Sequence, residues 1–216
     1  VPTGLKTFLY AWICKGLLKN KAILAAGPNV TGIPLLMNIY NPSPLLTSHM
    51  ADVWIEMSQI RVEQCVREGT QREHIFCIPH SVDTKAFSPA FRDRTIWTSL
   101  GISTAAKIIL FTGRVDADIK GIPELIEAFK KIKLTVKDAV LVFVGRVQMD
   151  ISKFKSLPDV FFLGPKSGDE FVKFIASADL FMAASRYETF WFCPLDAMSC
   201  ELPVVVSEVG AVTDMI

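Results

Sequence analysis

The chain has 216 residues, which is enough for one large domain or for parts of two. Half of the residues are hydrophobic, and the mean hydropathy of +0.36 suits a parallel sheet that is buried on both faces. The 23 basic and 22 acidic residues nearly cancel, so the charge balance argues against a nucleic-acid partner.

The cysteines and histidines do not have the spacing of a metal site. The five cysteines form no CxxC pair, and His49, His74 and His80 lack metal-ligand spacing. An odd number of cysteines in apolar surroundings argues for free thiols in a reducing compartment. No signal peptide is evident at Val1, and we expect the sequence to begin inside a longer, cytoplasmic protein.

The first fifty residues contain an amphipathic segment and an uncharged one. Apolar residues at helical spacing predict a helix over residues 5–19, interpreted as a surface helix docked on a sheet. The alternative is a basic amphipathic surface for anionic lipid, which would bring the protein to the membrane surface. A short strand is predicted over residues 22–26. Residues 22–51 carry no charge, but six glycines and prolines interrupt them and argue against a transmembrane helix.

The remaining pattern is an alternation of strands and helices. Residues 52–56 and 75–79 are predicted strands around a helix at 59–68. After Pro89, strands are predicted at 107–112, 139–144, 160–163, 179–183 and 202–207, and helices at 95–100, 123–133 and 169–178. This order predicts βαβ units with right-handed crossovers, and therefore an α/β fold with a Rossmann-like parallel sheet.

The loop between the strand at 107–112 and the next helix has the residues of a diphosphate site. It contains Gly113, Arg114, Lys120 and Gly121. A helix N-terminus offers free N–H groups, an arginine can grip two phosphate oxygens, and a lysine supplies a point charge. The alternative is a solvated turn with ordinary surface charges.

Two carboxylates, Glu188 and Asp196, lie eight positions apart between the last two predicted strands, the first in a loop and the second on a short predicted helix. Ligands of open parallel sheets bind where loops leave the carboxyl ends of the strands. Two acceptors there suit a polyhydroxylated ligand, whose hydroxyl groups donate hydrogen bonds. The alternative for Asp196 is that its charge supports a helix N-terminus.

The segment around these carboxylates resembles the E-x7-E signature of the retaining family-4 glycosyltransferases, which have the GT-B fold. The chain departs from that signature at Thr189 and Trp191, where the family prefers glycine, and at Asp196, where it prefers glutamate. The shared residues are Ser185, Glu188, Phe190, Ala197, Met198, Pro203, Val204, Val205, Ser207 and Gly210.

Two further segments are similar to the same family. The loop at 111–121 resembles its G-R-x-x-x-x-K-G motif, with one extra residue between Arg114 and Lys120 that we expect to bulge out around residues 116–118. Residues 78–89 resemble the segment that closes the N-terminal domain, with His80 and Ser81 in place of asparagine and glycine. The resemblance implies that residues 1–88 form the C-terminal part of the acceptor-side (N-terminal) domain and the linker. Residues 89–216 would then form the nucleotide-sugar domain without its last strand and helices.

The resemblance also implies roles for the site residues. Glu188 contacts the transferred sugar, Asp196 binds the ribose, and the backbone N–H groups of Phe190 and Trp191 approach the sugar and the diphosphate. Arg114 and Lys120, beside Gly113, stabilise the leaving diphosphate without a metal. Arg146, after the strand at 139–144, touches the base or a phosphate, or is a surface arginine.

The expected function is transfer of a hexose from a nucleotide-diphosphate sugar to a glycan, lipid or small-molecule acceptor, with retention of configuration and without a cofactor. Glu188, Arg114 and Lys120 are the candidate catalytic residues. The altered glycines favour an alternative, a catalytically inactive nucleotide-sugar-binding relic. A sugar-nucleotide epimerase or a phosphorylase would lack this pair of motifs. We also expect self-association, because exposed apolar faces recruit partners.

Overall fold

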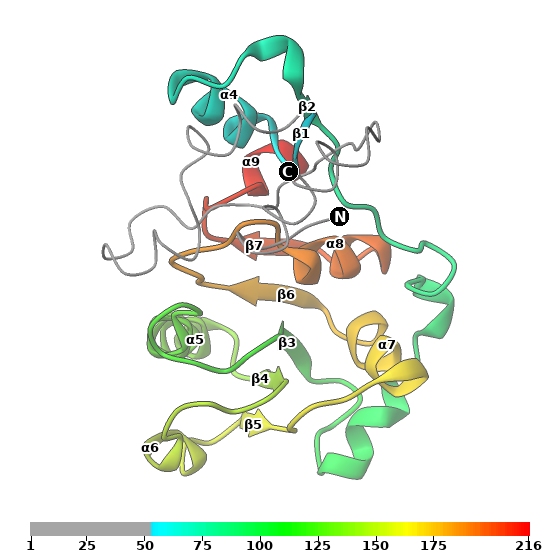
Figure 1. Cartoon of the computed structure of the whole chain (residues 1–216). Coiled ribbons are helices and arrows are strands. Elements are labelled where there is room, and N and C mark those ends of the chain that lie inside the picture. Colours follow the sequence, from blue (N-terminus) through cyan, green and yellow to red (C-terminus); the bar gives the residue numbers. More distant parts are fainter. Residues whose placement is uncertain (1–52) are drawn as a thin grey trace. The chain divides into compact units, whose positions relative to one another are not determined.

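The computed structural model describes residues 53–216 (Figure 1). Residues 1–52 lie outside the described residues. They include the helix predicted at 5–19, the strand predicted at 22–26, His49 and the first residue of the strand predicted at 52–56. One compact unit comprises the described residues up to His80 together with Gly210–Ile216, and the other comprises Ser81–Val209. Within residues 53–216, no helix is long and apolar enough to cross a membrane.

The first unit contains a small parallel sheet with one helix packed against it. Its elements are β1 (Trp54–Glu56), α4 (Gln59–Arg67), the 3₁₀ helix η1 (Arg72–His74), β2 (Ile75–Cys77) and α9 (Val212–Met215). Ser58 caps α4, because its hydroxyl oxygen accepts a hydrogen bond from the Arg61 N–H at 3.3 Å. The core of this unit is formed by Trp54, Val62, Cys65 and Ile75.

The second unit is built on a five-stranded parallel sheet. Its strands are β3 (Lys107–Thr112), β4 (Ala139–Val144), β5 (Val160–Phe162), β6 (Leu180–Ala183) and β7 (Val204–Val206). Their lateral order is β5-β4-β3-β6-β7, so the chain moves outward from β3 to β5 and then returns to the other side of β3. The strand order therefore reverses between β3 and β6, which is where open α/β sheets bind ligands.

Helices cover both faces of this sheet. The helices are α5 (Ile122–Thr135), α6 (Ser152–Lys155), α7 (Gly168–Ala176) and α8 (Phe192–Ser199). Figure 1 shows α5 and α6 on one side of the sheet and α7 and α8 on the other. All residues of β4 and all but the first of β3 are buried, as expected for central strands covered on both faces. The predicted α/β fold with a parallel sheet is confirmed.

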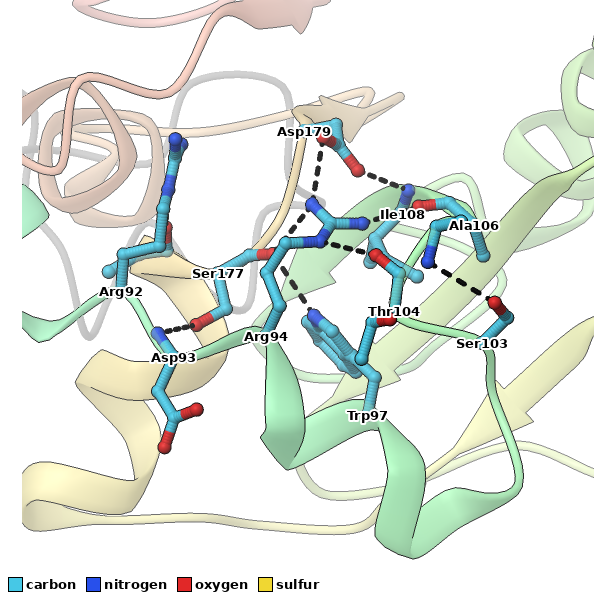
Figure 2. Close-up of polar contacts among 12 residues, drawn as sticks. Arg92, Asp93, Arg94, Trp97, Ser103, Thr104, Ala106, Ile108, Ser177 and Asp179 are labelled. Carbon is cyan, nitrogen blue, oxygen red and sulfur yellow. Dashed lines mark hydrogen bonds and ion pairs between the residues drawn. The ribbon is translucent and has the colours of Figure 1, made fainter.

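The segment before β3 is held at the amino-terminal edge of the sheet by a polar network (Figure 2). It contains two 3₁₀ helices, η2 (Pro89–Phe91) and η3 (Arg94–Leu100); the second forms where we predicted a helix at 95–100. The Arg94 guanidinium donates to Asp179 Oδ1 at 2.9 Å and to the Thr104 carbonyl at 2.7 Å. Asp179 Oδ2 in turn accepts from the Ile108 N–H at 2.7 Å.

The same network is closed by a buried tryptophan. The side chain of Trp97 is buried, and its Nε1–H donates to the Ser177 carbonyl at 3.0 Å. The backbone N–H of Asp93 donates to the Ser177 hydroxyl at 2.8 Å. The segment is thus fixed to the turn between α7 and β6, beside the residues at which β3 and β6 begin (Figure 2).

Candidate functional site

Two loops meet at the carboxyl ends of β3 and β6, which are neighbours in the sheet. The loop of residues 113–121 connects β3 to α5, and the loop of residues 184–191 connects β6 to α8. The Arg186 N–H donates a hydrogen bond to the Ile119 carbonyl at 2.8 Å. This bond joins the two loops directly, so the two sequence motifs lie on one edge of the sheet.

Gly121 allows the loops to pack closely. Its φ of +60° lies in the left-handed region, and a Cβ built on it would be 2.1 Å from the Ala184 carbonyl oxygen. No side chain can be accommodated at that distance, and the backbone conformation itself favours glycine. Gly121 therefore sets the spacing between the residue that precedes it, Lys120, and the loop after β6.

The central contact of the site is an ion pair between Lys120 Nζ and Glu188 Oε1. The two side chains are only 15% and 12% exposed. The Ser185 hydroxyl donates to the same carboxylate oxygen at 2.8 Å. The other oxygen, Oε2, takes part in neither contact. The structure thus brings together one candidate cation and one candidate carboxylate that are far apart in the sequence.

An aromatic ring also holds the lysine. Lys120 Nζ lies 5.7 Å from the centroid of the Trp191 ring, a distance at which a cation is attracted to the ring face. The Trp191 side chain is only 2% exposed, and that of the preceding Phe190 is buried too. At the position where the resemblance leads us to expect glycine, this chain has a buried tryptophan against the candidate catalytic lysine. The predicted role of the Phe190 and Trp191 N–H groups stays a prediction.

The loop between Arg114 and Lys120, which is one residue longer than the family motif, is exposed at Asp118 and Ile119 but not at Asp116. Asp116 is turned inward, with a side chain that is 14% exposed. Its Oδ1 accepts from the N–H groups of Ile119 and Lys120, at 2.8 and 3.2 Å. Its Oδ2 accepts from Arg114 Nε at 2.5 Å. Hydrogen bonds to the carboxylate, which the sequence pattern does not report, determine the path of the loop.

Electrostatics keep the Asp116 carboxyl ionised. Burial alone would raise its pKa, but the hydrogen bonds from the Ile119 N–H, the Arg114 side chain and the Lys120 N–H outweigh burial and lower the pKa. Arg114 itself is 43% exposed and can reach a ligand in solution.

The loop after β4 lies beside the loop after β3. The Val115 N–H donates to the Arg146 carbonyl at 2.9 Å, and a Cβ built on Gly145 would be 1.7 Å from the Gly113 carbonyl oxygen. This close approach requires glycine at position 145 and places Arg146 in the loop adjacent to Arg114. Arg146 thus lies at the carboxyl-terminal edge of the sheet, and its side chain is exposed. Its contact with the base or a phosphate stays a prediction.

Asp196 lies on α8, and the ion pair that Lys120 forms is with Glu188 rather than with Asp196. Burial raises the pKa of its carboxyl to about 6. Cys193, one turn earlier on the same helix, is not among the residues that the sequence pattern singles out. Burial raises the pKa of the Cys193 thiol, and the charges of Lys120, Asp196 and Glu188 all act on it. A lone cysteine in an apolar sequence carries no signal that could have placed it there.

In the described part of the chain, no group of three or more His, Cys, Asp or Glu side chains could hold a metal ion. His80 is exposed at the end of the first unit.

Comparison with known proteins identifies the family. Residues 106–216, which contain both loops, match the family model described as "Glycosyl transferases group 1". The chain belongs to this family. The predicted glycosyltransferase resemblance is therefore confirmed at the level of the family.

Relatives of this glycosyltransferase chain include enzymes of different specificity. The chain is 32% identical over 139 residues to the sulfoquinovosyl transferase SQD2 of Arabidopsis thaliana, a match that covers 62% of the chain and 26% of the relative. It is 30% identical over 186 residues to a GDP-mannose-dependent alpha-mannosyltransferase of Corynebacterium glutamicum, covering 82% and 43%. The chain thus spans less than half of either relative.

A solved structure supports the fold. Anabaena HepE in complex with UDP superposes with a TM-score of 0.78 at 18% identity, covering 98% of the chain and 60% of HepE. The expected GT-B type of fold is confirmed by this likeness.

Proposed function

We propose that this chain binds a nucleotide-diphosphate sugar at the carboxyl ends of β3 and β6. As part of a glycosyltransferase, it would transfer the hexose to an acceptor with retention of configuration. The observation that carries the proposal is the contact between Lys120 and Glu188 across the point where the strand order reverses. Family membership supports transfer as the reaction, and retention rests on the E-x7-E-like spacing of Glu188 and Asp196.

In this proposal, Arg114 and Lys120 bind the diphosphate. Breaking the bond between the sugar and the diphosphate leaves negative charge on the leaving group, and preorganised cations stabilise such charge. Lys120 is already fixed by Glu188 and Trp191, so little reorganisation is needed when the charge develops. Two protein cations at this position can supply the positive charge that the leaving diphosphate needs, and we expect transfer without a metal or a cofactor.

The carboxylates recognise the sugars. Glu188 Oε2 is not used by Lys120 or Ser185, so it is the oxygen that we assign to a hydroxyl of the transferred hexose. Asp196, on α8, is assigned to the ribose hydroxyls. HepE was solved in complex with UDP-glucose, and the Corynebacterium relative is named for GDP-mannose, so the proposal specifies a nucleoside-diphosphate hexose without choosing the base.

The acceptor is a glycan, a lipid or a small molecule, and the expected location is the cytoplasm or the cytoplasmic membrane surface. One observation favours a second candidate function, binding of a nucleotide sugar without transfer. Trp191 occupies a position next to Lys120 where glycine would let the sugar approach the backbone.

Titration calorimetry with UDP-, GDP- and ADP-hexoses tests the binding step, and incubation of the whole protein with donor and acceptor tests transfer. We expect binding of at least one donor and a product whose anomeric configuration, read by NMR, matches the donor. Binding without transfer or donor hydrolysis would favour the second candidate. An inverted product, or activity that EDTA abolishes and magnesium restores, would contradict the proposed mechanism.

A further inference from the structure

We propose that Asp116 is a positioning residue that aims Arg114 at the diphosphate of the donor. The inference rests on the proposed function of the site and adds a residue to it. Asp116 lies in the part of the loop that is one residue longer than the glycosyltransferase motif, and its side chain points into the loop rather than into solvent.

The two oxygens of Asp116 have different partners. Oδ1 accepts from the Ile119 and Lys120 N–H groups at 2.8 and 3.2 Å, which closes the loop just before α5. Oδ2 accepts from Arg114 Nε at 2.5 Å. One carboxylate therefore connects the backbone of the candidate lysine to the side chain of the candidate arginine.

The contact at Nε determines how Arg114 can bind an anion. A guanidinium is planar, so a carboxylate fixed at Nε leaves the two terminal nitrogens, Nη1 and Nη2, to grip a phosphate through parallel hydrogen bonds. Arg114 is 43% exposed, and without this contact a long side chain would lose rotamer entropy when the ligand binds. Fixing it beforehand lowers that cost, which is the general benefit of preorganisation.

The negative charge of Asp116 and its contact with Arg114 predict opposite effects of its substitution on diphosphate affinity. Asp116 is negative and lies beside a site for an anion, so removing its charge should strengthen diphosphate binding if only the net charge matters. If Asp116 orients Arg114, removing the contact should weaken binding. The sign of the effect therefore distinguishes the two roles.

The test compares Asp116→Asn with Asp118→Asn in the same loop. The asparagine keeps an oxygen that can accept from the Ile119 and Lys120 N–H groups, but an amide NH₂ replaces the oxygen that faces Arg114 Nε. Asp118 is exposed, and its substitution removes the same charge two residues away without touching Arg114. Affinities for UDP, GDP and ADP, and for the three nucleosides, are measured by calorimetry on the whole chain, with melting temperatures as a check on folding.

We expect Asp116→Asn to weaken binding of the preferred nucleoside diphosphate about tenfold, the size of a charge-assisted phosphate contact, and to leave nucleoside affinity unchanged. Asp118→Asn should leave diphosphate affinity equal or higher. In the background of Arg114→Ala, Asp116→Asn should cause no further loss of affinity, because the contact it removes is already absent. If Asp116→Asn lowers the melting temperature, Asp116→Ser replaces it, since a serine oxygen can also accept from the loop.

Equal or tighter diphosphate binding by Asp116→Asn would overturn the inference, as would a loss of the same size in the Arg114→Ala background. If Arg114→Ala weakens binding and Asp116→Asn does not, the proposed function stands and only this inference fails. If the unmodified chain binds none of the three diphosphates, both are wrong.

Discussion

Lys120 and Glu188 share one contact but are assigned to different parts of the donor. Their pairing keeps two largely buried charges compensated in the absence of ligand, where an isolated buried charge would be costly. A diphosphate is a second anion for Lys120, and a sugar hydroxyl is a new donor for Glu188. The pair is therefore arranged to exchange part of its internal contact for contacts with the ligand.

Substitution of the two carboxylates should affect different kinetic constants. In the full-length protein, Glu188→Gln should lower kcat by roughly 10- to 100-fold, because a contact that strengthens in the transition state is worth about 1.5–3 kcal/mol. Asp196→Asn should mainly raise the donor KM, and Asp196→Glu should be tolerated. Steady-state kinetics with varied donor measure both constants. Transfer that survives neutralisation of both carboxylates would show that neither has the assigned role.

Asp196 should also make stability depend on pH. Burial raises its pKa from 3.8 to about 6, so the folded chain holds a proton that the unfolded chain loses between these values. The resulting cost is absent below about pH 4, grows as the pH rises to 6, and is complete above it. Asp196→Asn should therefore stabilise the chain at pH 8, by about 1 kcal/mol after allowance for solvent screening.

Urea denaturation of both forms at pH 4.5 and 8 checks this expectation. The gain from the asparagine should be smaller at pH 4.5, and a gain that does not change with pH would refute the assigned pKa.

For individual residues, the sequence pattern predicts which side chains lie in the candidate site, but it does not predict the contacts between them. Arg114, Lys120 and Glu188 were selected because they follow strands whose carboxyl ends meet at one edge of a parallel sheet. The inward turn of Asp116 depends on hydrogen bonds to backbone groups, which have no sequence signature. The burial of Trp191 against Lys120 depends on the space left between two loops.

At the level of elements, the close packing of the loop after β3 against the loop after β6 requires Gly121. Gly121→Ala should destabilise the chain and weaken nucleotide binding, because the new methyl group would displace the loop at Ala184. Gly101→Ala is the matched control: its φ of +74° is also left-handed, but nothing lies within 4 Å of the added Cβ. The control should lose only about 1–2 kcal/mol of conformational energy.

Thermal melts and calorimetry on both variants separate the two effects. Nucleotide affinity should fall in Gly121→Ala alone. Equal behaviour of the two variants would mean that the close approach to Ala184 does not control the site.

The network around Arg94 should contribute more to stability than an exposed ion pair of the same type. Arg94→Ala removes hydrogen bonds to Asp179 and to the Thr104 and Ala106 carbonyls (Figure 2). It should lower the free energy of unfolding by about 2–4 kcal/mol, because partly buried acceptors lose their donor. Arg186→Ala breaks an exposed pair with Glu124 and should cost less than about 1 kcal/mol. Denaturation midpoints compare them, and similar losses would argue against a structural role for the network.

The elements most accurately predicted are those with the strongest pattern. The predicted ranges 107–112 and 139–144 coincide with β3 and β4, because continuous apolar runs ended by glycine leave little ambiguity. The helices α6 and α9 were missed, since each has four residues and a single turn shows no periodicity. The predicted helix at 95–100 forms as a 3₁₀ helix, a distinction that depends on tertiary contacts of Trp97.

In the second unit the candidate site lies at the carboxyl ends of β3 and β6, and among the described residues β5 and β7 are the outermost strands of the sheet. The predicted division at residues 88 and 89 stays a prediction. In the structure the boundary between the two units falls between His80 and Ser81, and Gly210–Ile216 belongs to the first unit. All of the candidate site residues fall within the second unit, so its binding properties can be measured independently of how the units are arranged.

We expect self-association, if it occurs through strand pairing, to involve β7. This strand is an edge of the sheet, and Val205 at its centre is an exposed apolar residue. Edge strands present unpaired backbone groups that can pair with another chain, and charged side chains oppose such pairing. Val205→Lys should therefore shift sedimentation profiles at high concentration toward the monomer. Nucleotide affinity should not change, because the site lies at the ends of β3 and β6.

Leu134→Lys provides the control for this prediction. Leu134 is also an exposed apolar residue, but it lies near the end of the helix α5 and not in a strand. Its substitution removes apolar surface and adds the same charge, so it should leave association unchanged if strand pairing is responsible. If both lysine variants dissociate equally, general charge repulsion would be the cause. A chain that is monomeric at every concentration would show that the exposed edge of β7 does not recruit a partner.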